Sequence, residues 1–114
     1  MKAIELRKSI SEILVEHNAF YGDNTGSFDE NNYKINYQIA NSLLIENQRT
    51  YIVDFDIWSN DTVEVEKVSD ELEALLNYKT YASATFYLDN RYHADEKEIY
   101  RRTLTYEVRT FNEN

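Results

Sequence analysis

Cysteine and proline are both absent from this chain, and glycine occurs only twice. Without cysteine there is neither a disulfide framework nor a thiolate metal site, so the hydrophobic core must hold the fold unaided. Proline commonly blocks the edges of β-sheets, so its absence leaves strand edges open for pairing. The two glycines, Gly22 and Gly26, lie in one polar segment and are too few for most phosphate-binding loops.

Positive charge is also scarce, because 12 Lys and Arg residues stand against 21 Asp and Glu residues, for a net charge of −9. Such an acidic chain repels phosphate backbones and anionic lipid headgroups, so we expect no nucleic acid and no membrane as a partner. No long apolar run follows the basic residues near the N-terminus, so we expect no signal peptide and no membrane span. The acidity is concentrated between residues 54 and 73, whereas residues 97–109 contain more basic than acidic side chains.

The residues that are present suit a folded domain with a modest core. The chain has 114 residues, of which 42% are hydrophobic and 14% aromatic, and this favours one domain spanning residues 1–114. Ten of the aromatic residues are Tyr. A sheet can bury several of them, but ten in so small a domain indicate that some are exposed, and Tyr is enriched in protein interfaces.

Hydrophobic periodicity predicts two helices. Apolar residues recur at helical spacing among charged ones from Ala3 to Asn18. The second helix, which runs to Asn77, has stronger signals: Asp61 and Glu64 have the spacing of a capping box, and acidic side chains at that end suit the helix dipole. One face of this second helix is apolar and consists of Val65, Val68, Leu72, Leu75 and Leu76.

Alternating apolar and polar residues predict strands on both sides of the second helix. One covers residues 33–39, with a further extended piece at 43–45 that continues it or pairs with it. The clearest runs from Thr50 to Trp58, with Trp58 on the same side as Asp54 and Asp56. Residues 21–27 read as a loop, and the remaining predicted strands cover residues 82–89 and 100–111, joined by residues 90–98.

This order of elements predicts an α+β fold. The chain is expected to form a single domain with a mainly antiparallel β-sheet and two α-helices packed on one face, in the order α-β-β-β-α-β-β.

Candidate chemistry is sparse. Asp54, Asp56 and Asp61 offer oxygen atoms for a divalent cation, but neighbouring acids on the wet face of a strand are more often solvated. His17 and His93 are isolated and lack the positioned partner that acid–base catalysis requires. No nucleophile elbow, phosphate loop or zinc spacing occurs. We therefore expect no enzyme activity, no cofactor and no metal.

The stretch Tyr51-Ile52-Val53-Asp54-Phe55-Asp56-Ile57-Trp58-Ser59 carries the one family resemblance. With the opening helix, the acidic Leu-rich helix that follows and the paired closing strands, the chain resembles the tail terminator or tail completion proteins of long-tailed phages and prophages, which include small head-to-tail joining proteins. The resemblance covers nearly the whole chain as an order of elements and is sharpest from Phe55 to Ser59. Residues 21–32 and 90–98 show no family feature.

The resemblance implies a virion protein that forms a ring, commonly of six copies, and stops growth of the tail tube. Its implied partners are further copies of itself, the tail tube protein and a head connector or stopper protein. Its implied location is the tail or the head–tail interface of the virion, after assembly in the cytoplasm of the bacterial host.

A ring needs contacts between two different patches of one surface. The acidic second helix and the more basic final strand are candidates for these patches, and complementary charge would set their register. The alternative is that these charges pair within one subunit or face water. The candidate subunit-interface residues are Glu66, Asp70, Glu73, Arg101, Arg102 and Arg109.

Two other function classes remain open. The acidity also suits an inhibitor or immunity protein that binds a basic enzyme surface. The aromatic content also suits a small-ligand-binding α+β domain.

Overall fold

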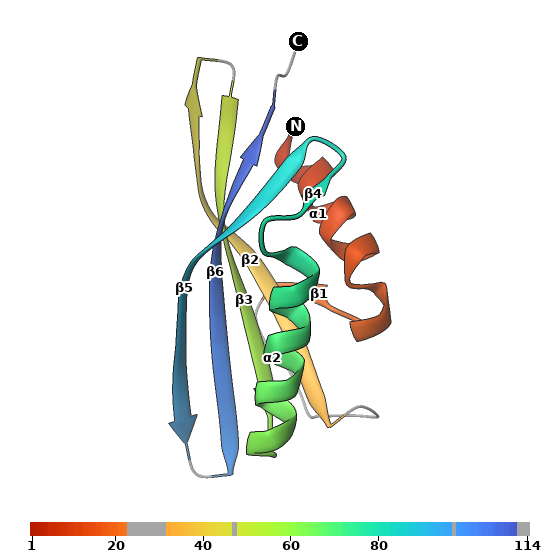
Figure 1. Ribbon diagram of the computed structural model, residues 1–114, viewed down its shortest axis with the longest axis vertical. Helices are drawn as coiled ribbons and strands as arrows, with labels where there is room; N and C mark the ends of the chain where they lie inside the picture. Colours follow the sequence, from red (N-terminus) through yellow and green to blue (C-terminus); the bar gives the residue numbers. More distant parts are fainter. Residues whose placement is uncertain (23–31, 47, 97, 112–114) are drawn as a thin grey trace.

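A six-stranded sheet with the order β1-β2-β3-β6-β5-β4 is the framework of the computed structural model, which describes residues 1–22, 32–46, 48–96 and 98–111 (Figure 1). Neighbouring strands are antiparallel except β1 and β2, which are parallel. Two short strands form the outer edges and four long strands lie between them. Their bounds are β1 (Phe20–Tyr21), β2 (Tyr33–Ile45), β3 (Gln48–Ser59), β4 (Thr80–Tyr81), β5 (Ala84–Glu96) and β6 (Ile99–Thr110).

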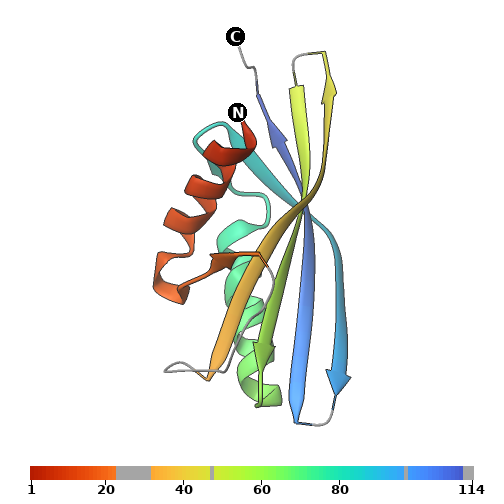
Figure 2. The ribbon, with the colours of Figure 1, turned by 180° about the vertical axis from the view of Figure 1, so that it is seen from behind.

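Two helices, α1 (Ala3–Ile13) and α2 (Thr62–Leu76), cover the same face of this sheet (Figures 1 and 2). The predicted α+β class, the two helices on one face and the order α-β-β-β-α-β-β are confirmed, apart from the additional short strand β4. The first helix is shorter than predicted. It ends at Ile13 and is followed by a 3-10 turn (Val15–His17), and Asn18 then stops the helix with a left-handed backbone, φ 51°.

The core lies between the helices and the sheet. Alternate residues of β3 point toward the helices and are buried, as the predicted alternation requires. Four aromatic rings on neighbouring strands form a layer of the core that runs across the sheet, with neighbouring ring centroids 5.7–6.2 Å apart. Such aromatic pairs contribute about 1 kcal/mol each beyond the area that they bury. The four rings are Tyr37, Phe55, Tyr106 and Phe86.

The N-terminus of α2 is capped as predicted, with one difference. The Asp61 carboxylate accepts hydrogen bonds from the backbone N–H groups of Val63 (2.9 Å) and Glu64 (3.4 Å). The capping-box prediction has the Glu64 side chain reaching back to the N–H of Asp61. Instead, that N–H donates to the hydroxyl of Ser59 at 3.1 Å, so the last residue of β3 fixes the entry into the helix.

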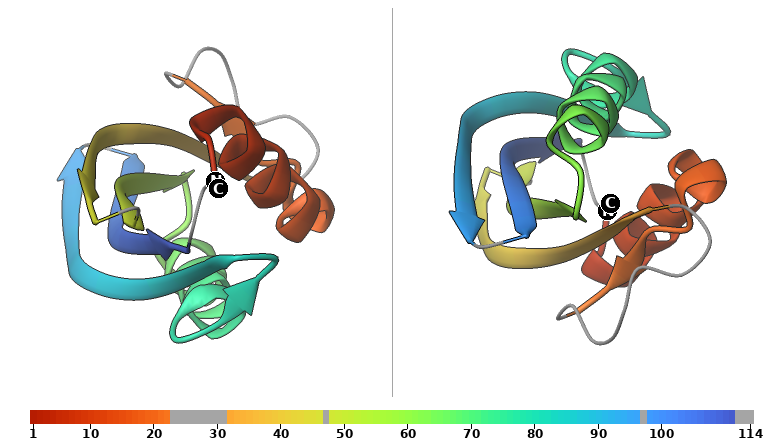
Figure 3. Two further views of the ribbon diagram at one scale, coloured as in Figure 1. Left: turned by 90° about the horizontal axis from the view of Figure 1, so that it is seen from above. Right: turned by 90° about the horizontal axis from the view of Figure 1, so that it is seen from below.

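The sheet is strongly twisted, and seen from its ends it curls around the long axis of the molecule (Figure 3). A bulge interrupts β2 at Ala40 and another interrupts β5 at Asp89. Bulges bend a strand and increase its twist. The molecule is elongated, 47 × 23 × 22 Å, with the β2–β3 hairpin at one end and the β5–β6 hairpin at the other.

Three connections differ from prediction. Residues 90–98 do not form a long connection, because β5 continues to Glu96 and pairs with β6 over that length. The strand expected from Ala82 begins at Ala84, because Ala82 lies in the tight turn between β4 and β5 with φ 54°. In the predicted 21–27 loop, Tyr21 belongs to β1 and the part beyond Gly22 lies outside the described residues. The extended piece at 43–45 is the end of β2.

Candidate interaction surfaces

An ion-pair network joins α2 to the two strands beneath it. Arg91 of β5 contacts three carboxylates of α2: Glu66 at 3.1 Å, Asp70 at 3.1 Å and Glu73 at 3.4 Å. These acidic side chains occupy the same side of the helix and meet one guanidinium group. Burial alone would lower the pKa of Arg91, but the three carboxylates outweigh it and the pKa is raised.

Arg102 of β6 extends the network and is almost completely buried, with 8% of its surface exposed. Its guanidinium group donates to the Glu66 carboxylate through Nε and to Asp95 through Nη1, the latter at 2.6 Å. These hydrogen bonds outweigh the effect of burial and raise the pKa of Arg102. The network thus ties the acidic face of α2 to the final hairpin.

Four of the six candidate interface residues therefore meet one another within the subunit or share a partner there. These are Glu66, Asp70, Glu73 and Arg102.

The other two lie on the opposite face of the sheet. Arg101 stands over the ring of Trp58 (5.2 Å), and Arg109 stands over Tyr87 (4.7 Å) and pairs with Glu107 at 3.2 Å. The structure thus does not gather all six residues into one patch. Their role in a subunit interface remains a prediction.

The face of the sheet that the helices leave uncovered is polar. Trp58 shares this face with Asp54 and Asp56, as predicted. Each carboxylate accepts a hydrogen bond from a threonine of β6: Asp54 from Thr105 at 2.7 Å and Asp56 from Thr103 at 2.5 Å. With Asp61 used as a helix cap, the three acids are separated, and no group of three or more potential ligands suited to a metal occurs among the described residues.

The two histidines have different surroundings. His17 is the last residue of the 3-10 turn after α1, where its Nδ1 shares a hydrogen bond with the hydroxyl of Tyr33 (2.8 Å) and its Nε2 lies 4.0 Å from Glu71 of α2. Burial, together with the charge of Glu71, raises the pKa of the Tyr33 phenol. His93 is exposed on β5. His17 thus has a packing role between the helices and β2.

A basic groove separates α1 from the outer strands β1 and β2 and has a volume of about 470 Å³. The Arg7 guanidinium lies 3.8 Å from the centre of the Tyr21 ring, and the hydroxyl of Tyr37 donates to the backbone oxygen of Arg7 at 3.0 Å. Lys8 adds a second cation. Sequence reasoning missed this site, because helix and strands meet here only through the fold. The groove is lined by Ile4, Arg7, Lys8, Ser11, Tyr21 and Tyr37.

Fold and surface together define a two-layer α+β domain with a curled, mostly antiparallel sheet. No protein-family model matches the chain, and no curated protein matches it. A solved structure, the virion of a native gene transfer agent particle, contains a chain of similar fold, with a TM-score of 0.54. The two chains are 8% identical, and the match covers 89% of this chain and 83% of that one. At 8% identity, the similarity between the two chains is a similarity of fold.

None of the described helices has both the length and the apolar character needed to cross a membrane.

Proposed function

We propose that this chain is a structural subunit of a phage or prophage virion and acts by ordered self-association. The observation that carries the proposal is the fold shared with a chain of the gene transfer agent virion over 89% of the length. Two sheet edges that none of the described strands covers along their full length, in a chain without proline, support it further. A structural role requires binding and no chemical turnover.

The finer proposal is that the subunit is a tail terminator or head-to-tail joining protein. Its support is the resemblance centred on Tyr51–Ser59, which forms the central strand β3 and leads directly into the cap of α2. In this role a ring of subunits, commonly of six copies in the family that the chain resembles, covers the end of the last tube layer. The covered end no longer serves as a template for further tube subunits, and the opposite face of the ring docks to the head connector.

The test is deletion of the gene in a strain that produces the particle. We expect heads without attached tails and tubes of uncontrolled length, and plasmid-borne wild-type protein should restore normal particles. Electron microscopy of the lysates measures both features. Normal tails joined to heads in the deletion strain would contradict the terminator role.

The inhibitor alternative has less support. It rests on the net charge of −9 alone, whereas the chain of similar fold described above belongs to a virion particle. On α2, Arg91 and Arg102 of the same chain already contact Glu66, Asp70 and Glu73, which leaves these side chains less free to turn toward a partner.

A further inference from the structure

The sheet has two free edges, at opposite ends of the molecule. On one side β1 covers β2 only at Asn36 and Tyr37, and the side chain of Tyr21 reaches Ile39. The rest of β2, Asn41–Ile45, is not paired on its outer side with any described strand. Its Ser42 N–H is held by the neighbouring Asn41 side chain (2.8 Å), a contact that an incoming strand can replace.

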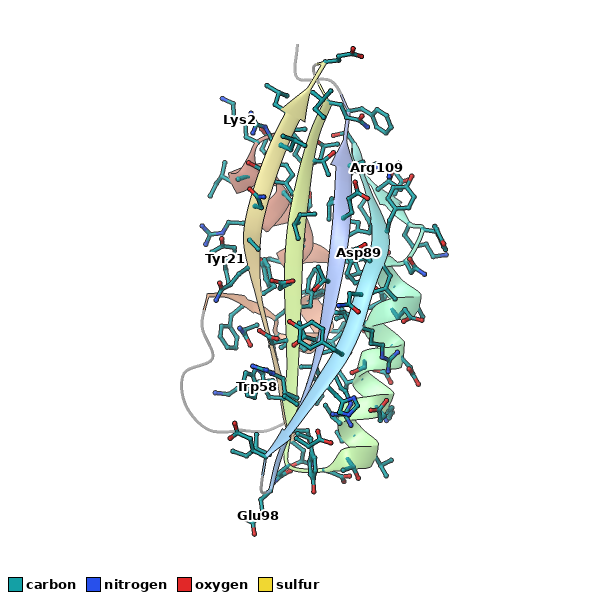
Figure 4. All side chains as sticks on the ribbon, turned by 90° about the vertical axis from the view of Figure 1, so that its left-hand side faces the viewer. Lys2, Tyr21, Trp58, Asp89, Glu98 and Arg109 are labelled. Atoms are coloured by element: carbon teal, nitrogen blue, oxygen red, sulfur yellow. The ribbon has the colours of Figure 1, made fainter. Side chains whose placement is uncertain are left out.

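The other free edge belongs to β5. The chain around β4 covers the start of β5, and the last such contact is made by the Asn77 side chain, which accepts from the N–H of Leu88 at 3.0 Å. From Asp89 to Glu96 no strand of the described chain lies outside β5. Figure 4 shows Tyr21 on the β2 side of the sheet and Asp89 on the β5 side.

Within the part of the chain that the structure describes, the free edge of β2 lacks the features that normally protect an edge. Asn41–Ile45 contains no charged residue and no proline. Three consecutive apolar side chains project from it: Leu43, Leu44 and Ile45, exposed by 58%, 51% and 59%. Monomeric proteins usually place lysine, proline or a covering loop on such a strand to prevent edge-to-edge pairing. This edge is therefore suited to accept another strand.

The surroundings of the two edges are opposite in charge. Arg7 and Lys8 line the basic groove together with Tyr37, in the part of β2 that leads into the free edge, and neither forms an ion pair with another residue in the described ranges. The free part of β5 carries exposed Asp89 and Glu96, for which the described chain likewise provides no ion pair. The basic side chains of one edge thus complement the acidic side chains of the other.

We propose that the free edge of β2 in one copy pairs with the free edge of β5 in a second copy, so that the sheet continues from subunit to subunit. A β2–β2 contact would bring two basic grooves together, and a β5–β5 contact would bring together two acidic edges. Only the mixed pairing places opposite charges next to each other, which selects partner and register. Because the two edges differ, the contact is heterologous and closes into a ring when the rotation allows.

The first test places lysine on the β2 edge, in the way natural edges are protected. Leu43→Lys with Ile45→Lys should raise the dissociation constant for self-association of the full chain at least about tenfold, measured by sedimentation velocity. The matched control is Val15→Lys with Val63→Lys, which adds the same charge at exposed apolar positions away from the edge. An equal effect of both pairs of substitutions would overturn the proposed contact.

The second test reverses charge on each side. Arg7→Glu with Lys8→Glu, and separately Asp89→Lys with Glu96→Lys, should each weaken self-association at least about tenfold. An equimolar mixture of the two variants should regain it, because each reversed edge then meets the reversed edge of its partner. Lys67→Glu with Lys79→Glu is the control for net charge, and circular dichroism checks folding of every variant.

The inference rests on the proposed function, and the outcomes separate the two. If the wild-type protein assembles and all edge variants assemble equally well, the β2–β5 contact is overturned and the virion role stands. Loss of assembly without recovery in the mixture would overturn the charge complementarity that selects this pairing. Wild-type protein that stays monomeric at every concentration would overturn both this contact and self-association.

Discussion

Tyr106 holds a hydroxyl group that is buried without a hydrogen-bond partner among the described residues. Its ring packs edge-on against Phe55 and Phe86 in the centre of the aromatic layer. Burial raises the pKa of the Tyr106 phenol above its ordinary value, and the charge of Glu73 acts in the same direction. A buried polar group without a partner reduces stability by about 1–3 kcal/mol.

Tyr106→Phe should therefore raise the free energy of unfolding by about 1 kcal/mol at neutral pH, measured by urea denaturation. The gain should grow in alkali. Above the unfolded-state pKa of about 10, the phenol ionises in the unfolded chain but stays neutral in the folded one, because its folded-state pKa is raised. The free energy of unfolding of the wild type therefore falls as the pH rises above this value. Tyr106→Phe has no phenol and does not show this fall. As a contrast, Tyr51→Phe removes a hydrogen bond to the Met1 carbonyl (2.8 Å) and should destabilise. A Tyr106→Phe protein less stable than wild type would contradict the argument.

Arg102 and Arg109 belong to the same strand but differ in burial, so they form a natural comparison. Arg102→Ala leaves Glu66 and Asp95 without their shared guanidinium and should reduce the free energy of unfolding by about 2–3 kcal/mol, less than for a fully buried pair because both carboxylates are partly exposed. Arg109→Ala removes an exposed pair with Glu107 and should change it by less than about 0.5 kcal/mol. Equal effects would show that the network does not stabilise the subunit.

At the scale of elements, α2 depends on a single capping side chain. Asp61→Ala removes the acceptor for two backbone N–H groups and should reduce the free energy of unfolding by about 1 kcal/mol. Asp61→Asn is the matched control, because asparagine caps helices about as well as aspartate. Guanidinium denaturation of both variants measures the difference. An alanine variant as stable as the asparagine variant would contradict the assignment of the cap.

Elements with one strong local pattern were predictable from sequence. Alternation along β3 and the apolar face of α2 follow from burial on one side, and the structure confirms both. The second half of β5 was not predictable. Asp89 and Asn90 are residue types that strands disfavour, yet β5 continues past them and pairs with β6 as far as Glu96, so this pairing overrides local preference.

The contacts of the candidate interface residues were likewise not predictable from local sequence patterns. The acidic face of α2 and the basic residues of β6 are visible in the sequence as charge patterns. That Glu66 meets Arg102, 36 residues away, depends on how the hairpin lies beneath the helix. Arg91 was missed for the related reason that its segment was expected to be a connection. Residues of α1 and β1 create the basic groove only once the chain has folded.

At the scale of the whole molecule, the proposed association depends partly on charge. The pairing of a basic groove with an acidic edge should weaken as salt is added, because the Debye length falls from about 10 Å at 0.1 M to about 3 Å at 1 M. We expect the dissociation constant for self-association to rise over this range, measured by sedimentation velocity at fixed protein concentration. An assembly strengthened by salt would indicate an apolar contact without charge selection.

The central claim is that this domain is built to associate with copies of itself. Native mass spectrometry of the full chain over a range of concentrations tests it most directly. The account predicts one closed oligomer whose mass is a fixed multiple of the 13.6 kDa subunit and whose population grows with concentration. A 13.6 kDa monomer at every concentration would contradict it.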